Sequence, residues 1–186
     1  MDRRSFLLGA GALLVSTFPA AAQAARKFTL PPEFEPQVVS VPFTFAPGTV
    51  VVDPPNRFLY LIEEPGVARR YGVGVGRSGA GFRGTAEIGR KAKWPHWRPT
   101  DNMIRRNPKK YARYAGGMKG GPGNPLGSRA LYLYRNGRDT MYRIHGTTEP
   151  WTIGRAVSNG CIRMVNAHVE DLYERVPLGA TVVVLE

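Results

Sequence analysis

The chain has 186 residues, of which 26 are Lys or Arg and 14 are Asp or Glu, so its formal net charge is +12. This length suits about one domain plus an extension, and 22 Gly with 16 Pro favour short strands and turns over a helical bundle. The single cysteine excludes a disulfide within the chain, and the positive charge favours an anionic partner.

Residues 1–24 have the pattern of a secretory signal peptide. Arg3 and Arg4 precede an apolar run at 6–18, and Ala22-Gln23-Ala24 has the small residues of a cleavage site. The paired arginines resemble a twin-arginine export signal. The apolar run is too short to span a bilayer. We therefore expect a cleaved leader, no stable membrane span in the mature form, and a location in the periplasm or cell envelope; an uncleaved N-terminal anchor is the alternative.

Residues 25–47 contain five prolines and no helical period, which predicts an extended or irregular linker that lies along the domain or tethers it. The domain proper is expected at 48–186. Apolar runs at 49–52, 57–63 and 68–76, separated by turn residues, predict an antiparallel meander.

Gly74, Gly76 and Gly79 have the spacing of a dinucleotide-binding fingerprint. Gly81 and Gly84 follow at once, so no helix can start there to receive a pyrophosphate. We therefore reject a nucleotide site and assign these glycines to turns.

Residues 91–127 form a basic and aromatic insertion, with nine Lys or Arg against one acidic residue, Asp101. It contains Trp94-Pro95-His96-Trp97, and Thr100 is suited to cap one short helix. Long irregular insertions are typical of lids and binding loops. A solvated basic face and a nucleic-acid surface are the alternatives. Since an exported protein rarely meets nucleic acid, we expect no such partner.

The C-terminal third predicts regular elements in quick succession. Runs at 130–134 and 140–144 flank Asn136-Gly137, which indicates a β-hairpin whose second strand delivers His145. Asn166 is expected to cap a helix over 167–176, and 181–185 is apolar enough for a central strand. The apolar face of the helix is expected from Val169, Leu172, Tyr173 and Val176. His168, on the same helix, lies among polar residues and is expected to be exposed.

Cys161 and His145 are the candidate nucleophile and base. A thiol attacks as its thiolate, and a free thiol with a pKa near ~8.5 is only a few per cent ionised at neutral pH. An imidazole titrates near neutrality and can take the proton. An unpaired cysteine in an exported protein is a free reactive thiol or an intermolecular link. The alternative is a buried structural cysteine with a hydrogen-bonded core histidine.

The run Ser158-Asn159-Gly160-Cys161 is a small, turn-forming segment in which glycine permits a tight turn ahead of the sulfur. Its backbone N–H groups are candidates to bind an oxyanion. His96, His145 and His168 are far apart and show no ligand spacing, so we expect no metal and no cofactor.

The segments Ile144–Thr147 and Ser158–Met164 together resemble the active-site signature of the L,D-transpeptidase catalytic domain family (YkuD type). Further parts of 48–186 contribute to the resemblance: Tyr71–Gly76, Trp94-Pro95, Gly121–Gly127 and Asp171–Pro177. The resemblance implies a mainly β fold with short helices (α+β), built as a mixed β-sheet sandwich with one C-terminal-region helix packed on the sheet.

The family acts on peptidoglycan stem peptides. The resemblance implies that Cys161 attacks the carbonyl of the third stem residue, usually diaminopimelate, and releases D-Ala, with His145 as proton acceptor and donor. An amine of a second stem then resolves the thioester to a 3→3 cross-link. Hydrolysis, D-amino acid exchange or lipoprotein attachment use the same acyl-enzyme. A non-catalytic cell-wall binding module is the alternative of a different class.

The resemblance also implies supporting groups. The Gly160 and Cys161 N–H groups form the oxyanion hole, and a backbone carbonyl orients His145. Arg163 binds a substrate carboxylate, for which its geometry is suited, or braces the loop. Substrate contacts are expected from Arg163, Ser158, Gly146 and Trp94.

Two departures from the family pattern affect these expectations. Asn159 stands where many members carry His, so His145 must be the only imidazole base. Residues 107–119 are more basic than in relatives, which leaves the acceptor preference open. Peptidoglycan stems are the expected partners, as donor and acceptor, and we expect a monomer.

Overall fold

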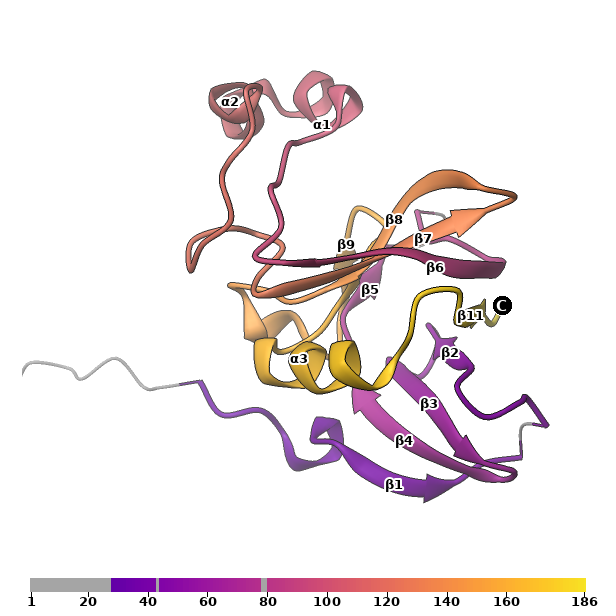
Figure 1. Ribbon diagram of the computed structural model, residues 1–186. Coiled ribbons are helices and arrows are strands. Elements are labelled where there is room, and N and C mark those ends of the chain that lie inside the picture. Colours follow the sequence, from indigo (N-terminus) through magenta and orange to yellow (C-terminus); the bar gives the residue numbers. More distant parts are fainter. Residues whose placement is uncertain (1–27, 43, 78–79) are drawn as a thin grey trace, which may run out of the picture.

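The computed structural model describes residues 28–186 except 43, 78 and 79 (Figure 1). The expected signal peptide at 1–24 lies outside the described residues. In chain order the elements are η1 (Pro32–Phe34), β1 (Gln37–Ser40), β2 (Val50–Asp53), β3 (Phe58–Glu64), β4 (Val67–Gly72), β5 (Val75–Gly76), β6 (Gly84–Lys93), α1 (Asp101–Arg106), α2 (Pro108–Tyr111), η2 (Ala112–Tyr114), β7 (Arg129–Arg135), β8 (Arg138–His145), η3 (Pro150–Thr152), β9 (Ala156–Ser158), β10 (Ile162–Arg163), α3 (Asn166–Arg175) and β11 (Thr181–Val184).

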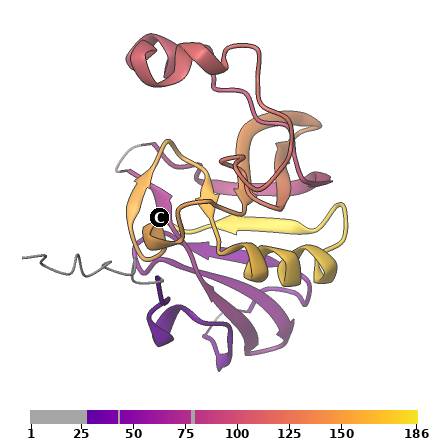
Figure 2. The same ribbon diagram turned by 90° about the vertical axis from the view of Figure 1, so that its left-hand side faces the viewer.

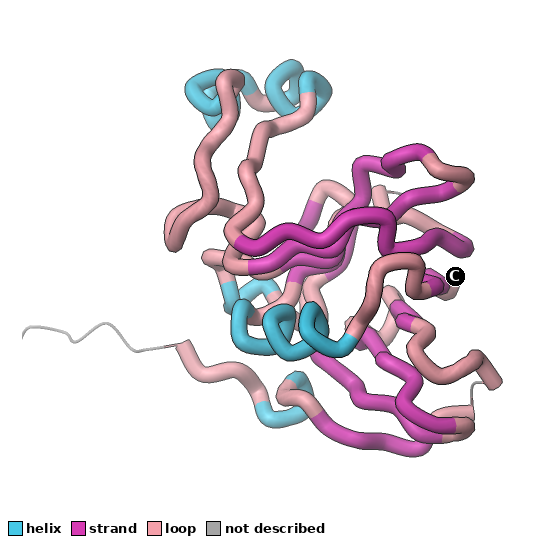
Figure 3. Tube along the Cα trace, in the orientation of Figure 1, coloured by secondary structure: helices cyan, strands magenta, loops and turns pink. Residues whose placement is uncertain are grey.

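Among the described residues, nine strands form one mixed sheet in the order β1-β4-β3-β2-β11-β6-β7-β8-β10. Neighbours are antiparallel except that β11 runs parallel to β2 and β10 runs parallel to β8. A separate two-stranded sheet pairs β5 with β9. The expected class, mainly β with short helices, is confirmed (Figure 3).

The predicted meander is present as β2, β3 and β4. Its third run divides in the structure, because β5 leaves the large sheet to pair with β9. The hairpin turn is as predicted, with Asn136 and Gly137 at φ 51° and 70°. Strand β11 lies in the middle of the sheet order, as its apolar sequence indicated.

The helix α3 packs on the sheet, as predicted. Val169, Leu172 and Val176 are fully buried and belong to one core with side chains of the strands. Figure 1 shows α3 between the β1–β4 end and the β6–β8 end of the sheet. This core holds β8 and β10 in place, and both strands carry residues of the site described below.

The structure corrects two boundaries. Within the expected linker, Gln37–Ser40 forms β1, an edge strand paired antiparallel with β4. The prolines that suggested a linker flank this strand, and an edge position tolerates them. The expected insertion at 91–127 begins later, because β6 continues to Lys93 and pairs with β7. The glycines in and before β6 hid this strand from the sequence pattern.

His168 was predicted to be exposed, and this is wrong. Its residue exposure is 8%, and its Nε2 lies 3.1 Å from Glu35 Oε2. Glu35 lies between η1 and β1, which cover this part of α3. The polar neighbours of His168 in sequence carried no information about a segment more than a hundred residues away.

We call residues 94–127 the lid. Figures 1 and 2 show its helices α1 and α2 standing away from the sheet on two connecting segments. The segments are joined by reciprocal backbone hydrogen bonds between Trp97 and Met118, of 2.9 and 2.6 Å. Thr100 caps α1 as predicted, its Oγ1 accepting from Met103 N at 3.2 Å. Neither α1 nor α2 contains a buried residue, so little packing of its own stabilises the lid.

Lys91→Met is expected to destabilise the fold. The Lys91 ammonium donates to the carbonyls of Tyr173 and, at 2.7 Å, Val176, which end α3. Removing these charge-assisted bonds should lower the free energy of unfolding by about 1–3 kcal/mol. Lys93→Met is the matched control, since Lys93 is exposed and lies 3.7 Å from Glu174, a contact worth less than about 1 kcal/mol. Urea unfolding measures both; equal losses would contradict the capping role.

Candidate active site

Two neighbouring strands bring the candidate nucleophile and base together. His145 ends β8, and Cys161 immediately precedes β10. The parallel register pairs Ile162 with Ile144 and Arg163 with His145. Cys161 therefore lies diagonally from His145, at roughly 8 Å between Cα atoms for a strand spacing of about 4.8 Å and a rise of about 3.3 Å per residue.

The side-chain alternation of these strands sets which groups share a face. Ile144 and Ile162 are buried in the core. Because successive side chains alternate, Cys161 and His145 share the opposite face with Arg163. The register thus places the thiol, the imidazole and the guanidinium on one face of these strands.

The His145 ring is oriented by a main-chain group. Its Nδ1 donates to the Gly146 carbonyl oxygen at 2.5 Å. This bond selects the tautomer in which Nε2 is free to accept a proton. Gly146, expected to contact substrate, therefore contributes the carbonyl that orients the base.

Burial keeps the imidazole neutral. His145 is 5% exposed. Desolvation lowers its pKa from 6.5 to about 4; the Gly146 hydrogen bond opposes this, and the charges of Arg163 and Arg143 add to it. At neutral pH His145 is therefore an unprotonated base.

The thiol is neutral at rest as well. Burial raises the pKa of Cys161, against a hydrogen bond from the Arg143 backbone and the positive charges of Arg143 and Arg163, which lower it. The site thus contains a thiol beside a neutral imidazole rather than a preformed ion pair. Proton transfer must accompany attack by the sulfur.

Two hydrogen bonds of Ser158 shape the loop before the sulfur. Ser158 Oγ accepts from Gly160 N at 3.0 Å and donates to the Cys161 carbonyl at 2.6 Å. Gly160 has φ +128°, and a Cβ there would collide with the Ala80 carbonyl and the Tyr142 ring. Both hydrogen bonds of the Ser158 hydroxyl are therefore made to backbone groups of its own loop. The Gly160 N–H, expected in the oxyanion hole, is bonded to Ser158 in this structure.

Asn166 braces the loop that follows His145. Its Oδ1 accepts from Ser128 N at 3.2 Å and Thr147 N at 3.1 Å. It was predicted to cap α3, but α3 has no side-chain cap bond. The position of an Asn before a helical period indicates a cap, and only the folded chain brings 128 and 147 within its reach.

Arg163 is ion-paired in the structure. Its Nη1 lies 2.7 Å from Glu149 Oε2 and 3.5 Å from Thr152 Oγ1. These contacts favour the bracing role among the two that the sequence left open. The pair nevertheless lies at the wall of the cavity described next, so Arg163 also faces any ligand there.

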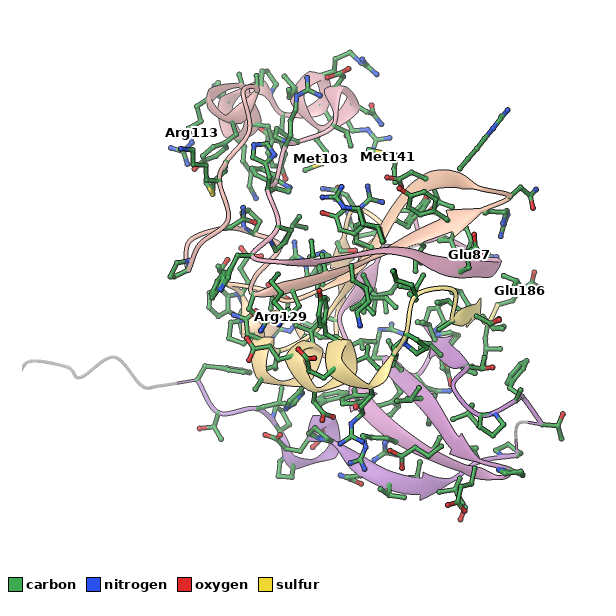
Figure 4. All side chains as sticks on the ribbon, in the orientation of Figure 1. Glu87, Met103, Arg113, Arg129, Met141 and Glu186 are labelled. Carbon is green, nitrogen blue, oxygen red and sulfur yellow. The ribbon has the colours of Figure 1, made fainter. Side chains whose placement is uncertain are left out.

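A cavity of about 260 Å³ opens on Cys161 and His145. The lid supplies an aromatic wall to it, with Trp97 lying 6.5 Å from Tyr111 and 5.5 Å from Tyr114 between ring centroids. Met103 and Arg113, which Figure 4 labels on the lid, also line it.

Trp94, expected at the substrate, is 46% exposed and is not among the residues that line this cavity. Trp97 occupies that place instead. The two tryptophans are three residues apart in the sequence. Only the path of the lid segment decides that Trp97, and not Trp94, lines the cavity.

The described residues contain no group of three or more His, Cys, Asp or Glu side chains placed to hold a metal ion. Within the same part of the chain, no helix has the length and apolar character needed to cross a membrane.

The buried imidazole predicts a pH dependence of stability. Below pH 6.5 the unfolded chain protonates His145, whereas the folded chain does so only near pH 4. The unfolded state binds more protons in this window, so the free energy of unfolding should fall as the pH falls from 6.5 to 4. His145→Gln removes this contribution, while His168, whose pKa is also lowered by burial, stays in both proteins.

Thermal unfolding across this pH range checks the prediction. The melting temperature of the wild type should fall more steeply with acid than that of His145→Gln. Parallel curves for the two proteins would show that His145 titrates normally in the folded chain.

Comparison with known proteins identifies a family. The L,D-transpeptidase catalytic domain family (YkuD) matches residues 47–184. A similar curated relative is the probable L,D-transpeptidase ErfK/SrfK of Escherichia coli K12, 31% identical over 153 residues, or 81% of this chain and 48% of that protein. The chain spans about half the length of the curated relatives that it matches.

A solved structure from Brucella melitensis, named a probable carnitine operon oxidoreductase caia, is 57% identical with a TM-score of 0.57, covering 84% of this chain and 96% of that one. The redox activity in that name belongs to that protein. Here Gly74 and Gly76 lie at β5, and the next helix among the described residues begins at Asp101. The glycine run thus does not open a helix, as a dinucleotide-binding motif does.

The L,D-transpeptidase structure from Mycobacterium smegmatis has a TM-score of 0.53 at 17% identity, covering 74% of this chain and 58% of that one, which shows a shared fold. The match of the family to 47–184 contains both active-site segments. This chain therefore belongs to the L,D-transpeptidase catalytic domain family.

Proposed function

We propose that this protein is a cysteine L,D-transpeptidase that acts on peptidoglycan stem peptides. The observation that carries the proposal is the register of β8 and β10, which sets Cys161 and His145 together at one cavity. Family membership, the orienting Gly146 carbonyl and the neutral imidazole support it.

In the first half-reaction, the Cys161 sulfur attacks the carbonyl carbon of the third stem residue while His145 Nε2 takes the thiol proton. The C–S bond forms, and the C–N bond to the terminal D-Ala breaks. The leaving amine takes the proton from His145, which returns to its neutral form. The product is a thioester, and no cofactor is needed.

The negative oxygen of the tetrahedral intermediate needs hydrogen-bond donors. With the Gly160 N–H bonded to Ser158, the Cys161 N–H is the candidate donor in the resting state. Gly160 joins it once Ser158 releases that N–H. Ser158 thereby contributes by shaping the loop before Cys161. The ion pair of Arg163 with Glu149 braces the chain that follows Cys161.

In the second half-reaction, the side-chain amine of a second diaminopimelate attacks the thioester carbon. A C–N bond forms and the C–S bond breaks, while the amine proton passes through His145 to the thiolate. The result is a 3→3 cross-link. Water, a free D-amino acid or a lipoprotein amine resolves the same thioester to a tripeptide, an exchanged tetrapeptide or an attached lipoprotein.

The substrate implies delivery to the cell envelope. We propose export by the cleaved twin-arginine-like signal at residues 1–24, followed by action in the periplasm as a monomer. Residues 1–24 carry Asp2, Arg3 and Arg4, so their removal changes the net charge from +12 to +11, which favours a wall polymer rich in carboxylates.

Cys161→Ala is expected to abolish turnover of purified tetrapeptide wall fragments and leave the fold intact, since the side chain only loses its sulfur. Mass spectrometry of the wild type should show release of D-Ala and a dimer, tripeptide or exchanged product. A carbapenem should add its mass to the wild type at Cys161 and not to the variant.

His145→Gln should lower the acylation rate by a factor of roughly 10² or more, because Gln cannot take the thiol proton. Circular dichroism verifies folding of both variants. A folded wild type that neither turns over stems nor forms an adduct would instead support the non-catalytic binding module.

A further inference from the structure

A second, larger cavity lies beside the catalytic one. Its volume is about 1060 Å³, and it runs between the lid and the segments that flank the nucleophile. It shares six lining residues with the smaller cavity: Met103, Lys110, Tyr111, Glu149, Asn159 and Arg163. Cys161 and His145 line the smaller cavity only. We call the larger one the basic groove.

The basic groove has an excess of positive charge. Its single acidic side chain, Glu149, is already paired with Arg163. The other cations that line it have no ion-pair partner among the described residues: Arg77, Arg106, Lys110 and Arg155. Four positive charges around one groove repel one another. An anionic ligand that binds in the groove would relieve this repulsion, so the lining favours an anionic ligand.

Two of these arginines lie next to the paired strands β5 and β9 rather than on the lid. Arg77 follows β5, and Arg155 precedes β9, the strand paired with β5. Arg77 N donates to the Ser158 carbonyl at 3.1 Å, and its Nη2 donates to Asn159 Oδ1 at 2.8 Å. Arg77 is thus tied to the loop that carries Cys161.

We propose that the basic groove is the site of the acceptor stem and that Arg77 and Arg155 select acceptors with free carboxylates. This inference rests on the function proposed above. The donor carbonyl must reach Cys161 and so occupies the smaller, aromatic cavity. The acceptor enters from the groove that joins that cavity at Asn159 and Arg163.

The chemistry of the acceptor fits this groove. The attacking amine of diaminopimelate shares its carbon with a carboxylate. Guanidinium groups bind carboxylates through two parallel hydrogen bonds, which orients the ligand as well as attracting it. A carboxamide at that carbon has no charge and offers only one acceptor oxygen.

The test compares two acceptors that differ only by carboxylate or carboxamide beside the amine. Wild type acylated with a tetrapeptide donor should transfer to the free acid faster, by roughly tenfold or more, the range for hydrogen bonds to a charged group. The double variant Arg77→Gln/Arg155→Gln should use both acceptors nearly equally. Arg155→Gln alone leaves the bond of Arg77 to Asn159 in place, so its acylation by donor or carbapenem should stay at the wild-type rate while its preference for the free acid falls.

Arg105→Gln/Arg138→Gln is the matched control. It removes the same charge from exposed arginines outside the basic groove, one on α1 and one on β8, and should keep the preference. Raising the salt concentration should reduce the preference of the wild type, since these groups are exposed.

The outcomes separate the two proposals. Acylation of the wild type without any preference between acid and amide overturns the acceptor site alone. An Arg155→Gln variant that loses acylation and transfer in equal proportion also overturns it, because Arg155 would then serve the donor rather than the acceptor. A wild type never acylated at Cys161 overturns the proposed function and this inference with it.

Discussion

The parallel pairing of β10 with β8 is the contact on which the site depends. It involves only two residue pairs, yet it sets Cys161 and His145 on one face while Ile144 and Ile162 anchor both strands in the core. A shift of one residue would turn the thiol towards that core. Burial of the two isoleucines in the core therefore sets the relative position of Cys161 and His145.

Burial then decides the chemical state of this pair. It lowers the pKa of His145 and raises that of Cys161, so both groups are neutral at rest. The lid contributes to this enclosure although its helices have no buried residues. The lid lines both the aromatic cavity and the basic groove, and the two cavities meet at Asn159 and Arg163.

Elements with a local signal were predicted well. The hairpin at Asn136-Gly137, the apolar face of α3 and the central strand β11 depend on periodicity and turn chemistry within a few residues. Errors arose where a distant segment decides the outcome. His168 is covered by the segment around Glu35, and Asn166 binds loops that precede it by many residues.

The sequence by itself determined the family and indicated the candidate nucleophile and base, because the motifs around His145 and Cys161 are local and specific. It also determined the positive charge. Only the tertiary structure decided which neighbours serve them: the Gly146 carbonyl orients the imidazole, Trp97 lines the cavity in place of Trp94, and Arg77 reaches the nucleophile loop. The contact of Arg77 with Asn159 joins residues far apart in the chain. The other two depend on how neighbouring residues are oriented, which strand register and packing set and no local pattern encodes.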